Sequence, residues 1–229
     1  MNTGIRVDRV GFGYNGSAVF RDLTLDLPGA ATTVIVGANG SGKSTLLGLM
    51  AGTLRPQCGV IDLCGITDIA LAVQHSQVSD TLPITVAEAV GMGRWRTLGL
   101  WKRPSRIDRE IVDHWIDEFG LTDLRRRKIG SLSGGQRQRT LLAQTFAQDA
   151  ALVLLDEPTV GLDAESWGRL ATRIDHVAAA GATVVAATHD IELARRFDFC
   201  ALLGRGGVLA SGAPAEVLTE RNLAALVLG

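Results

Sequence analysis

A chain of 229 residues is long enough for one well-buried domain with a subdomain, and too short for two full-sized enzyme domains. Hydrophobic residues make up 46% and charged residues 21%, proportions that exclude a globally disordered chain. The 23 Lys and Arg against 24 Asp and Glu give a net charge of −1, which argues against a broad nucleic-acid-binding surface, so we expect no nucleic-acid partner.

We expect neither a secretory leader nor a membrane span. No stretch approaches the roughly 18 consecutive apolar residues that indicate a spanning helix, and residues 1–6 lack the basic start and apolar segment of a leader. The expected location is therefore the cytoplasm. Cys58, Cys64 and Cys200 form no Cys-x-x-Cys pair, which favours reduced thiols over a disulfide framework or a zinc site.

The first thirty residues have the pattern of antiparallel β-structure. Leu23, Leu25 and Leu27 alternate with polar residues, the period of a strand with one solvated face. Three later runs are short and apolar throughout, as in strands buried on both faces, and helical patterns lie between them: residues 32–36, 151–155 and 183–187. This alternation predicts a parallel sheet with crossover helices.

Residues 78–150 predict a helical insert within that α/β core. Thr85 and Glu88 form a capping-box pattern that opens one helix, and Ser105 with Asp108 offers a weaker start to another. The domain is therefore expected to consist of an α/β core with its β-subdomain, over residues 1–77 and 151–229, and a helical subdomain over 78–150.

The second helix of this insert is expected to carry an apolar stripe and to stop at Gly120. The stripe residues are Ile107, Ile111, Trp115 and Phe119. Trp95 and Trp101 also fall in the insert, where an aromatic side chain either packs inside the subdomain or faces a partner. The sequence leaves both interpretations open for these two residues.

The first predicted parallel strand runs directly into a Gly-x-x-x-x-Gly-Lys-Ser motif, the P-loop pattern. Its residues are Gly37, Ala38, Asn39, Gly40, Ser41, Gly42, Lys43, Ser44 and Thr45. Glycines let the backbone curl so that successive N–H groups point at phosphate oxygens, and the helix that follows adds its positive dipole end. Lys43 would neutralise the β- and γ-phosphates, and the Ser44 hydroxyl would ligate Mg²⁺. The motif predicts nucleotide binding.

Two carboxylates, Asp156 and Glu157, follow the apolar run 152–155. Ligands bind at the carboxyl ends of strands in open α/β sheets, so both side chains are expected beside the P-loop. Asp156 suits the Mg²⁺ shell, and Glu157 is placed to orient or deprotonate an attacking water.

A second anion site is predicted at Ser133, Gly134 and Gly135, before a helix whose capping box is completed by Gln136. A hydroxyl and bare glycine N–H groups at a helix N-terminus can hold a phosphate. One nucleotide does not need two phosphate cradles on one chain. The second cradle is therefore expected to serve the nucleotide of another chain.

Taken together, these motifs resemble those of the ATP-binding subunits of ABC transporters over nearly the whole chain. The matching segments are Gly37–Thr45 (Walker A), Gln74 (Q-loop), Leu132–Gln136 (signature), Leu152–Glu157 (Walker B and catalytic Glu), Gly161-Leu162-Asp163 (D-loop), His189 (switch His) and Tyr14 (adenine-stacking aromatic). One departure is Val160-Gly161, which stands where many members have Ser-Ala. The resemblance implies a P-loop NTPase core of α/β class with a mainly parallel sheet, an N-terminal antiparallel β-subdomain and a helical subdomain insert.

The resemblance also implies an ATPase mechanism that uses ATP and Mg²⁺. It implies catalytic roles for Glu157, His189, Gln74 and Lys43, and Mg²⁺ ligation by Ser44, Gln74 and Asp156. It further implies nucleotide contacts by Tyr14, the P-loop residues, Ser133, Gly135, Gln136 and Asp163. Two such subunits would pair head to tail, on the inner face of a cell membrane and against a polytopic permease subunit.

The transported substrate is a separate question. Four segments are similar to those of zinc and manganese uptake subunits: Gly65–Gln74, Asp80–Val86, Gly91–Trp95 and Leu100–Ser105. Such systems include an extracytoplasmic metal-binding protein, so an indirect partner of that kind is expected. Iron-chelate importers share a similar Gly-x-Gly-Arg segment and remain the alternative.

Two other functions remain open at this point. A soluble ABC ATPase of repair or translation usually carries two cassettes or a long coiled-coil insert, and this chain has neither pattern. A regulatory module that holds ATP without hydrolysing it would not need Glu157 and His189, which are both present.

Overall fold

The structure is a computed structural model that describes residues 4–72, 83–98 and 103–228. Its chain forms two compact units. We call them the core unit (Met1–Leu71, Ala151–Glu157 and Asp175–Gly229) and the helical unit (Ala72–Ala150 and Pro158–Ile174). Within the described residues, no helix has both the length and the apolar character needed to cross a membrane.

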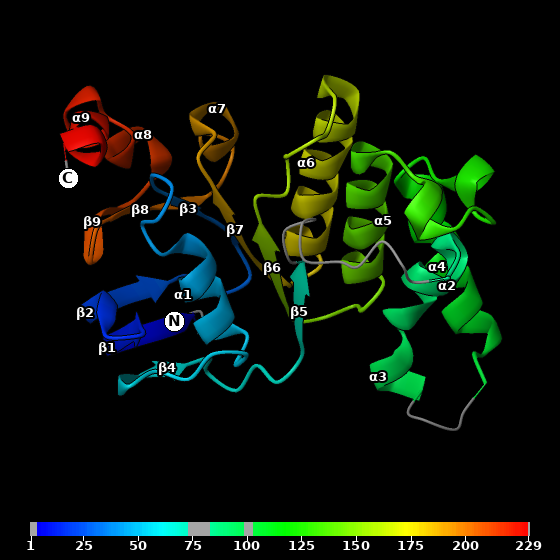
Figure 1. Cartoon of the computed structure of the whole chain (residues 1–229), viewed down its shortest axis with the longest axis horizontal. Coiled ribbons are helices and arrows are strands. Elements are labelled where there is room, and N and C mark those ends of the chain that lie inside the picture. The colour runs from blue at the N-terminus through cyan, green and yellow to red at the C-terminus, as the bar shows by residue number, and fades with distance from the viewer. Residues whose placement is uncertain (1–3, 73–82, 99–102, 229) are drawn as a thin grey trace. The chain divides into compact units, whose positions relative to one another are not determined.

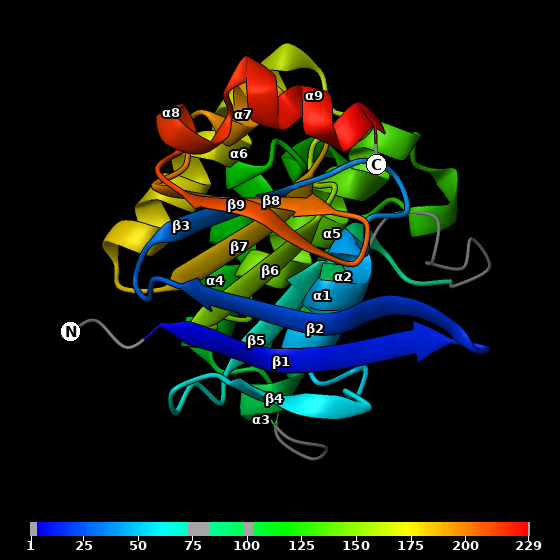
Figure 2. The ribbon, with the colours of Figure 1, turned by 90° about the vertical axis from the view of Figure 1, so that its left-hand side faces the viewer.

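The core unit begins with an antiparallel sheet in the order β2-β1-β4 (Figure 2). Its strands are β1 (Ile5–Tyr14), β2 (Ser17–Leu27) and β4 (Cys58–Asp62). Asn15 and Gly16 join β1 to β2 with φ of 48° and 84°, the left-handed pair that a two-residue hairpin turn needs. Leu23, Leu25 and Leu27 are buried and their polar neighbours are exposed, which confirms the alternation expected from the sequence.

The second sheet of the core unit has six strands in the order β5-β6-β7-β3-β8-β9 (Figure 1). They are β3 (Thr32–Val36), β5 (Ile69–Ala72), β6 (Leu152–Asp156), β7 (Thr183–Thr188), β8 (Phe199–Gly204) and β9 (Gly207–Gly212). β3 pairs in parallel with β7 and β8, and β6 pairs in parallel with β7, as predicted. β9 runs antiparallel to its neighbour, β8. Every residue of β3, β6 and β7 is buried, the pattern of strands covered on both faces.

The helices of the core unit are short and follow these strands. They are α1 (Lys43–Met50), α7 (Ile191–Ala194), α8 (Pro214–Val217) and α9 (Glu220–Leu228). α1 packs on β6 and β7, so the segment that precedes it lies at the carboxyl edge of the parallel strands. That edge also carries the residues that follow β6 and β7.

In the helical unit, α2, α4 and α5 pack on one another (Figure 1). Its helices are α2 (Val86–Met92), α3 (Trp95–Leu98), α4 (Arg106–Glu118), α5 (Gly134–Phe146) and the first part of α6 (Ala164–Ala179), with 3₁₀ turns at Thr122–Leu124 and Ile129–Ser131. The capping boxes predicted at Thr85, Ser105 and Ser133 are all present.

Residues 158–174 group with the helical unit, although the sequence placed them in the core. Two contacts join these residues to the rest of the helical unit. Arg173 of α6 forms an ion pair with Glu118 at the end of α4. The backbone at Gly161 also lies against Gly135 in the first turn of α5.

One residue of the expected apolar stripe on α4 lies elsewhere: the Ile107 prediction is wrong. Ile107 is 64% exposed, whereas Val112, Ile116 and Phe119 are buried. Positions four apart drift by about 40° per step on a helix of 3.6 residues per turn, so 107 and 119 cannot share one face. Trp115 is half-buried and stacks on Phe146 with ring centroids 5.1 Å apart. α4 ends at Glu118, and Gly120 with φ of 61° follows, as predicted.

The two isoleucines of α4 provide a matched test of this burial pattern. Ile116→Ala should lower the free energy of unfolding of the helical unit by about 2–5 kcal/mol, because Ile116 is 1% exposed and its removal leaves a cavity. Ile107→Ala makes the same chemical change on the same helix and should alter the free energy of unfolding by less than about 0.5 kcal/mol. Urea titration of both variants measures the difference, and equal losses would contradict the burial pattern.

Candidate functional site

The P-loop follows β3 and closes around the amine of Lys43. Lys43 Nζ donates to the carbonyl of Gly37 at 2.8 Å and to that of Ala38 at 3.2 Å, and the side chain is buried. Gly42 has φ of 99°, and a Cβ there would lie 2.6 Å from the ring of Phe20. Both the backbone angle and the lack of space therefore require glycine at this position.

The other P-loop side chains divide between the surface and the interior of the loop. Ala38, Asn39, Gly40 and Ser44 are exposed, whereas Gly37, Ser41 and Thr45 are buried. The buried hydroxyl oxygen of Ser41 has no hydrogen-bond partner within residues 4–72, 83–98 and 103–228. A buried hydroxyl in a phosphate-type loop without a protein partner is suited to a ligand oxygen.

Asp156 ends β6 beside the first turn of α1. The Ser44 hydroxyl hydrogen-bonds to its carboxylate, whose Oδ1 is buried and lacks a hydrogen-bond partner in the described part of the chain. Burial raises the pKa of Asp156, the charge of Glu157 adds to the rise, and the Ser44 hydrogen bond and the Lys43 charge oppose it. A hydroxyl and a carboxylate with a free oxygen are the hard ligands that Mg²⁺ prefers, so these residues fit the ion.

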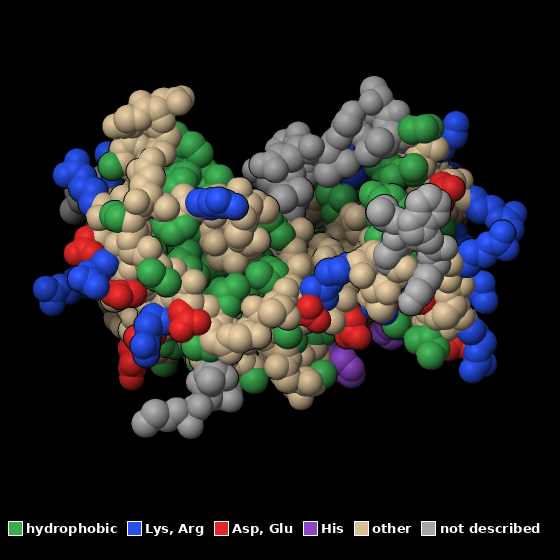
Figure 3. Space-filling model, turned by 90° about the horizontal axis from the view of Figure 1, so that it is seen from below, with side chains coloured by type: hydrophobic (Ala, Val, Ile, Leu, Met, Phe, Trp, Pro, Cys, Tyr) green, Lys and Arg blue, Asp and Glu red, His purple; other side chains and the backbone are tan. Residues whose placement is uncertain are grey.

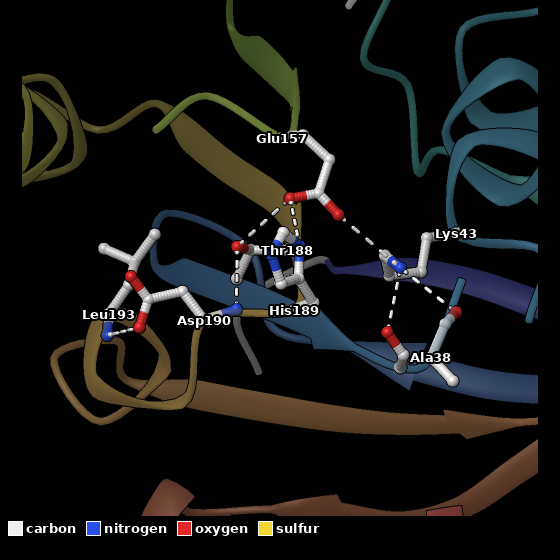
Figure 4. A network of polar contacts seen from close by, with 8 residues as sticks. Ala38, Lys43, Glu157, Thr188, His189, Asp190 and Leu193 are labelled. Carbon is white, nitrogen blue, oxygen red and sulfur yellow. Dashed lines mark hydrogen bonds and ion pairs between the residues drawn. The ribbon is translucent and has the colours of Figure 1, made fainter. Parts of the chain in front are cut away.

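Glu157 contacts both a cation and a histidine (Figure 4). Its Oε1 lies 3.6 Å from Lys43 Nζ, and its Oε2 lies 2.9 Å from His189 Nδ1 and 3.4 Å from the Thr188 hydroxyl that donates to it. Lys43, Glu157 and His189 thus form one chain of polar contacts across three strand ends. The Glu157 residue is only 8% exposed, which strengthens each of these interactions.

The backbone of Glu157 is strained. Its φ is 47°, a left-handed value that costs a residue with a Cβ about 1–3 kcal/mol. The Glu157 N–H donates to the carbonyl of Ala187 at 2.9 Å, which ties the turn to the end of β7. The strained conformation aims the side chain at His189 and Lys43, away from the direction taken by Asp156.

His189 is held by the turn between β7 and α7. Asp190 caps α7 by accepting from the N–H groups of Glu192 and Leu193, and its own N–H donates to the Thr188 hydroxyl at 3.1 Å. The ring of His189 remains 62% exposed. With a proton on Nδ1 the ring donates to Glu157 and leaves Nε2 as an acceptor toward solvent. The positioning roles of Thr188 and Asp190 were not predicted from the sequence, although the N-cap pattern at Asp190 was an available signal for one of them.

Tyr14 lies beside the β1–β2 hairpin turn of the core unit. Its side chain is 49% exposed and packs edge-on against Phe12, with ring centroids 5.0 Å apart. The hairpin therefore supports the ring while about half of the residue stays open to a ligand or to solvent.

The remaining candidates belong to the helical unit, and each has a role in that unit's own structure. The Ser133 hydroxyl accepts from the N–H of Gln136 at 3.3 Å, and Gln136 Oε1 accepts from the N–H of Ser133 at 3.0 Å. Asp163 Oδ1 accepts from the N–H of Ser166 at 2.8 Å at the start of α6. That hydrogen bond lowers the pKa of Asp163, with a smaller contribution from Arg139 and Arg169.

Gly135 and Gly161 approach each other closely. A Cβ on Gly135 would lie 2.5 Å from the carbonyl oxygen of Gly161, which leaves no room for a side chain. Gly161 has φ of 78°, so an alanine there would be strained. The departure noted at Val160-Gly161 therefore accompanies a backbone turn that glycine favours.

Lys43, Ser44, Asp156, Glu157 and His189 are thus brought together at one sheet edge of the core unit. Ser133, Gly135, Gln136 and Asp163 lie in the helical unit. Gln74 lies outside the described residues.

The profile of the ABC transporter family matches residues 20–160. The chain is 34% identical over 226 residues to the chelated iron transport system membrane protein YfeB of Yersinia pestis, an alignment that covers 95% of this chain and 76% of YfeB. It is 32% identical over 225 residues to the manganese transport system ATP-binding protein MntB of Bacillus subtilis. This alignment covers 96% of this chain and 90% of MntB.

A solved structure of a metal-chelate type ABC transporter in an inward-facing conformation has the same fold. Its TM-score is 0.84 at 32% identity, and the match covers 100% of this chain and 90% of that one. The P-loop and carboxylate geometry accords with these likenesses. The chain belongs to the ABC transporter family and is one of its ATP-binding, ATP-hydrolysing subunits.

Proposed function

We propose that this ATPase energises the import of a divalent metal ion, zinc or manganese, through a separate membrane subunit. The likeness to MntB, whose name gives manganese transport, supports this substrate class. The likeness to YfeB, named for chelated iron, supports iron-chelate import as the alternative. The observation that carries the ATPase part of the proposal is the contact chain from Lys43 through Glu157 to His189.

Glu157 is the proposed general base or water-orienting group. In the structure its carboxylate is shared by Lys43 and His189. An arriving γ-phosphate competes for Lys43, because a phosphate carries more charge than the carbonyls and the carboxylate that hold the amine now. Glu157 would then be free to orient the attacking water, with His189 holding the γ-phosphate.

Mg²⁺ is the proposed metal cofactor, held by Ser44 and Asp156, with Gln74 as a further ligand. When bound, the ion neutralises charge on the β- and γ-phosphates. The unsatisfied Oδ1 of Asp156 supports this assignment. The P-loop N–H groups and Thr45, which is buried at the start of α1, complete the phosphate site, and Tyr14 is proposed to stack on adenine.

Ser133, Gly135 and Gln136 are proposed to hold the γ-phosphate bound by a second copy of the chain, with Asp163 close by. The start of α5 provides a capped helix N-terminus whose first residue, Gly134, has open space where a side chain would stand. The active form would be a head-to-tail homodimer with two shared nucleotide sites.

The membrane subunit is proposed to dock on the helical unit, on the inner face of the membrane. The docking cavity, as we call it, has a volume of about 350 Å³ and is lined by both apolar and charged residues. Its lining includes Trp95, Leu98, Pro104 and Val112, and Trp95 is 61% exposed. Figure 3 shows basic side chains along the part of one face that the helical unit occupies. The segment 78–103, which carries Trp95 and Trp101, is proposed as part of this docking surface and lies partly outside the described residues.

Glu157→Gln should retain ATP binding and lower turnover about 10²–10⁴-fold, because it keeps the size of the side chain and removes the anion. With ATP uncleaved, the variant should accumulate as an ATP-dependent dimer in size-exclusion chromatography with MgATP. Adding Ser133→Arg should abolish that dimer by filling the cradle. Turnover at the wild-type rate would remove Glu157 from its role, and a persistent dimer of the double variant would contradict the shared site.

Trp95→Ala should weaken association with the membrane subunit about 30-fold, the loss of one interface anchor of about 2 kcal/mol. Co-purification and surface-based binding measurements report the change, and the ATP affinity of the variant serves as a check on folding. Val60→Ala is the control, because Val60 is equally exposed, at 61%, but belongs to β4. Equal association of both variants would contradict this docking surface.

A deletion strain should fail to grow in chelator-treated medium and should recover with zinc or manganese when the wild-type gene is restored. The Glu157→Gln gene should give no recovery at the same ion concentration, which ties the rescue to ATP hydrolysis. Rescue by an iron chelate alone would establish the alternative substrate.

A further inference from the structure

Arg94 joins two helices inside the helical unit. Its guanidinium is buried, with the residue 7% exposed. Nε donates to Asp108 Oδ1 at 3.1 Å, and Nη1 donates to the carbonyl of Ala147 at 3.0 Å. One side chain thus bonds to α4 and to the residue that ends α5.

Both partners of Arg94 are helix-terminal groups. Asp108 completes the capping box of α4, where its Oδ2 accepts from the N–H and the hydroxyl of Ser105 at 2.9 and 2.6 Å. Ala147 is the C-cap of α5, an end at which a cation is favourable. The guanidinium therefore fixes the start of α4 against the end of α5.

Gly93 allows this arrangement. A Cβ at this position would lie 2.4 Å from the carbonyl oxygen of Gln144 and 3.2 Å from the Cβ of Ala147. The end of α2 thus rests directly on the last turn of α5, and the next residue, Arg94, enters the junction. The Gly-x-Gly-Arg segment noted in the sequence therefore has a packing reason within this chain.

The junction also forms one wall of the docking cavity. Arg94 and Asp108 both line it, together with Trp95 and Leu98 of α3. At its other end α5 begins at Gly134, directly after Ser133 of the phosphate cradle. A helix of 13 residues spans about 20 Å, so α5 connects the cavity wall to the cradle as one rigid element.

We infer that Arg94 is a positioning residue that transmits occupation of the docking cavity to the phosphate cradle through α5. A membrane-subunit segment that shifts the cavity wall would shift the end of α5, because the guanidinium bonds to both. The inference rests on the proposed function. It adds a residue that touches neither the nucleotide nor the transported ion.

Arg94→Lys is the variant that isolates the link. A lysine ammonium can still pair with Asp108, so no buried carboxylate is left alone. Lacking the guanidinium fork, it cannot also hold the carbonyl of Ala147 in the same geometry.

The transporter is assembled in lipid vesicles with its membrane subunit and the extracytoplasmic binding protein. Its ATPase rate is measured with and without the ion or chelate that restores growth.

The readout is the ratio of the stimulated to the unstimulated ATPase rate. Arg94→Lys should reduce the stimulation about tenfold. A loss of folded protein would lower both rates and leave the ratio unchanged. Arg106→Lys is the matched control, since Arg106 also pairs with a carboxylate on α4, Glu110, but at the exposed surface. It should keep the wild-type ratio.

Asp108→Asn provides a second variant. It weakens the bond between Arg94 and residue 108 by removing the negative charge, and it keeps an oxygen that can accept from the guanidinium. It should lower the ratio in the same direction. A wild-type ratio in Arg94→Lys and Asp108→Asn would overturn the inference and leave the proposed function intact. Absence of stimulation in the wild-type assembly would instead overturn the proposed function, and the inference with it.

Discussion

The parallel strands β3, β6 and β7 are buried on both faces, and this constrains where the core unit can place polar side chains. Apart from Asp156, the last residue of β6, the residues of each strand are apolar or carry a small hydroxyl group, because an unpaired charge between the layers is too costly. Polar chemistry is therefore confined to the strand ends. Parallel strands end at the same edge, so Lys43 after β3, Asp156 at the end of β6 and His189 after β7 meet there.

The site at this edge depends on a strained backbone at Glu157 and on buried oxygens whose hydrogen bonds are not all made within the protein. Glu157 adopts a left-handed backbone conformation that puts its carboxylate between Lys43 and His189, whereas Asp156 turns toward Ser44. Adjacent carboxylates thereby serve different partners. The buried oxygens of Ser41 and Asp156 that lack partners among the described residues are costly in a resting protein, and a ligand would relieve that cost.

The helical unit follows a different principle, close contact through small residues and buried ion pairs. Gly93 and Gly135 stand where backbone from another segment leaves no space for a Cβ. Arg94 and Asp108 then connect helix ends that apolar packing alone would leave free to slide. Docking and phosphate binding are proposed at opposite ends of α5, so a rigid connection between them has functional value.

Several features of the site followed from local sequence signals. The glycines and lysine of residues 37–45, the carboxylates after an apolar strand and the three capping boxes are all short-range patterns with a short-range physical cause. The conformation of Glu157 and the roles of Thr188 and Asp190 were not predicted from the sequence. Those features depend on which strand ends lie side by side.

The fold class, the P-loop and the order of the motifs could all be predicted from the amino-acid sequence, because each depends on neighbouring residues and on hydrophobic period. The exposure of Ile107 and the grouping of residues 158–174 with the helical unit could not be predicted in this way. Nor could the bonds that Arg94 makes both to α4 and to the residue that ends α5. These outcomes depend on contacts between segments distant in the chain, and a local pattern carries no information about which distant group will be the partner.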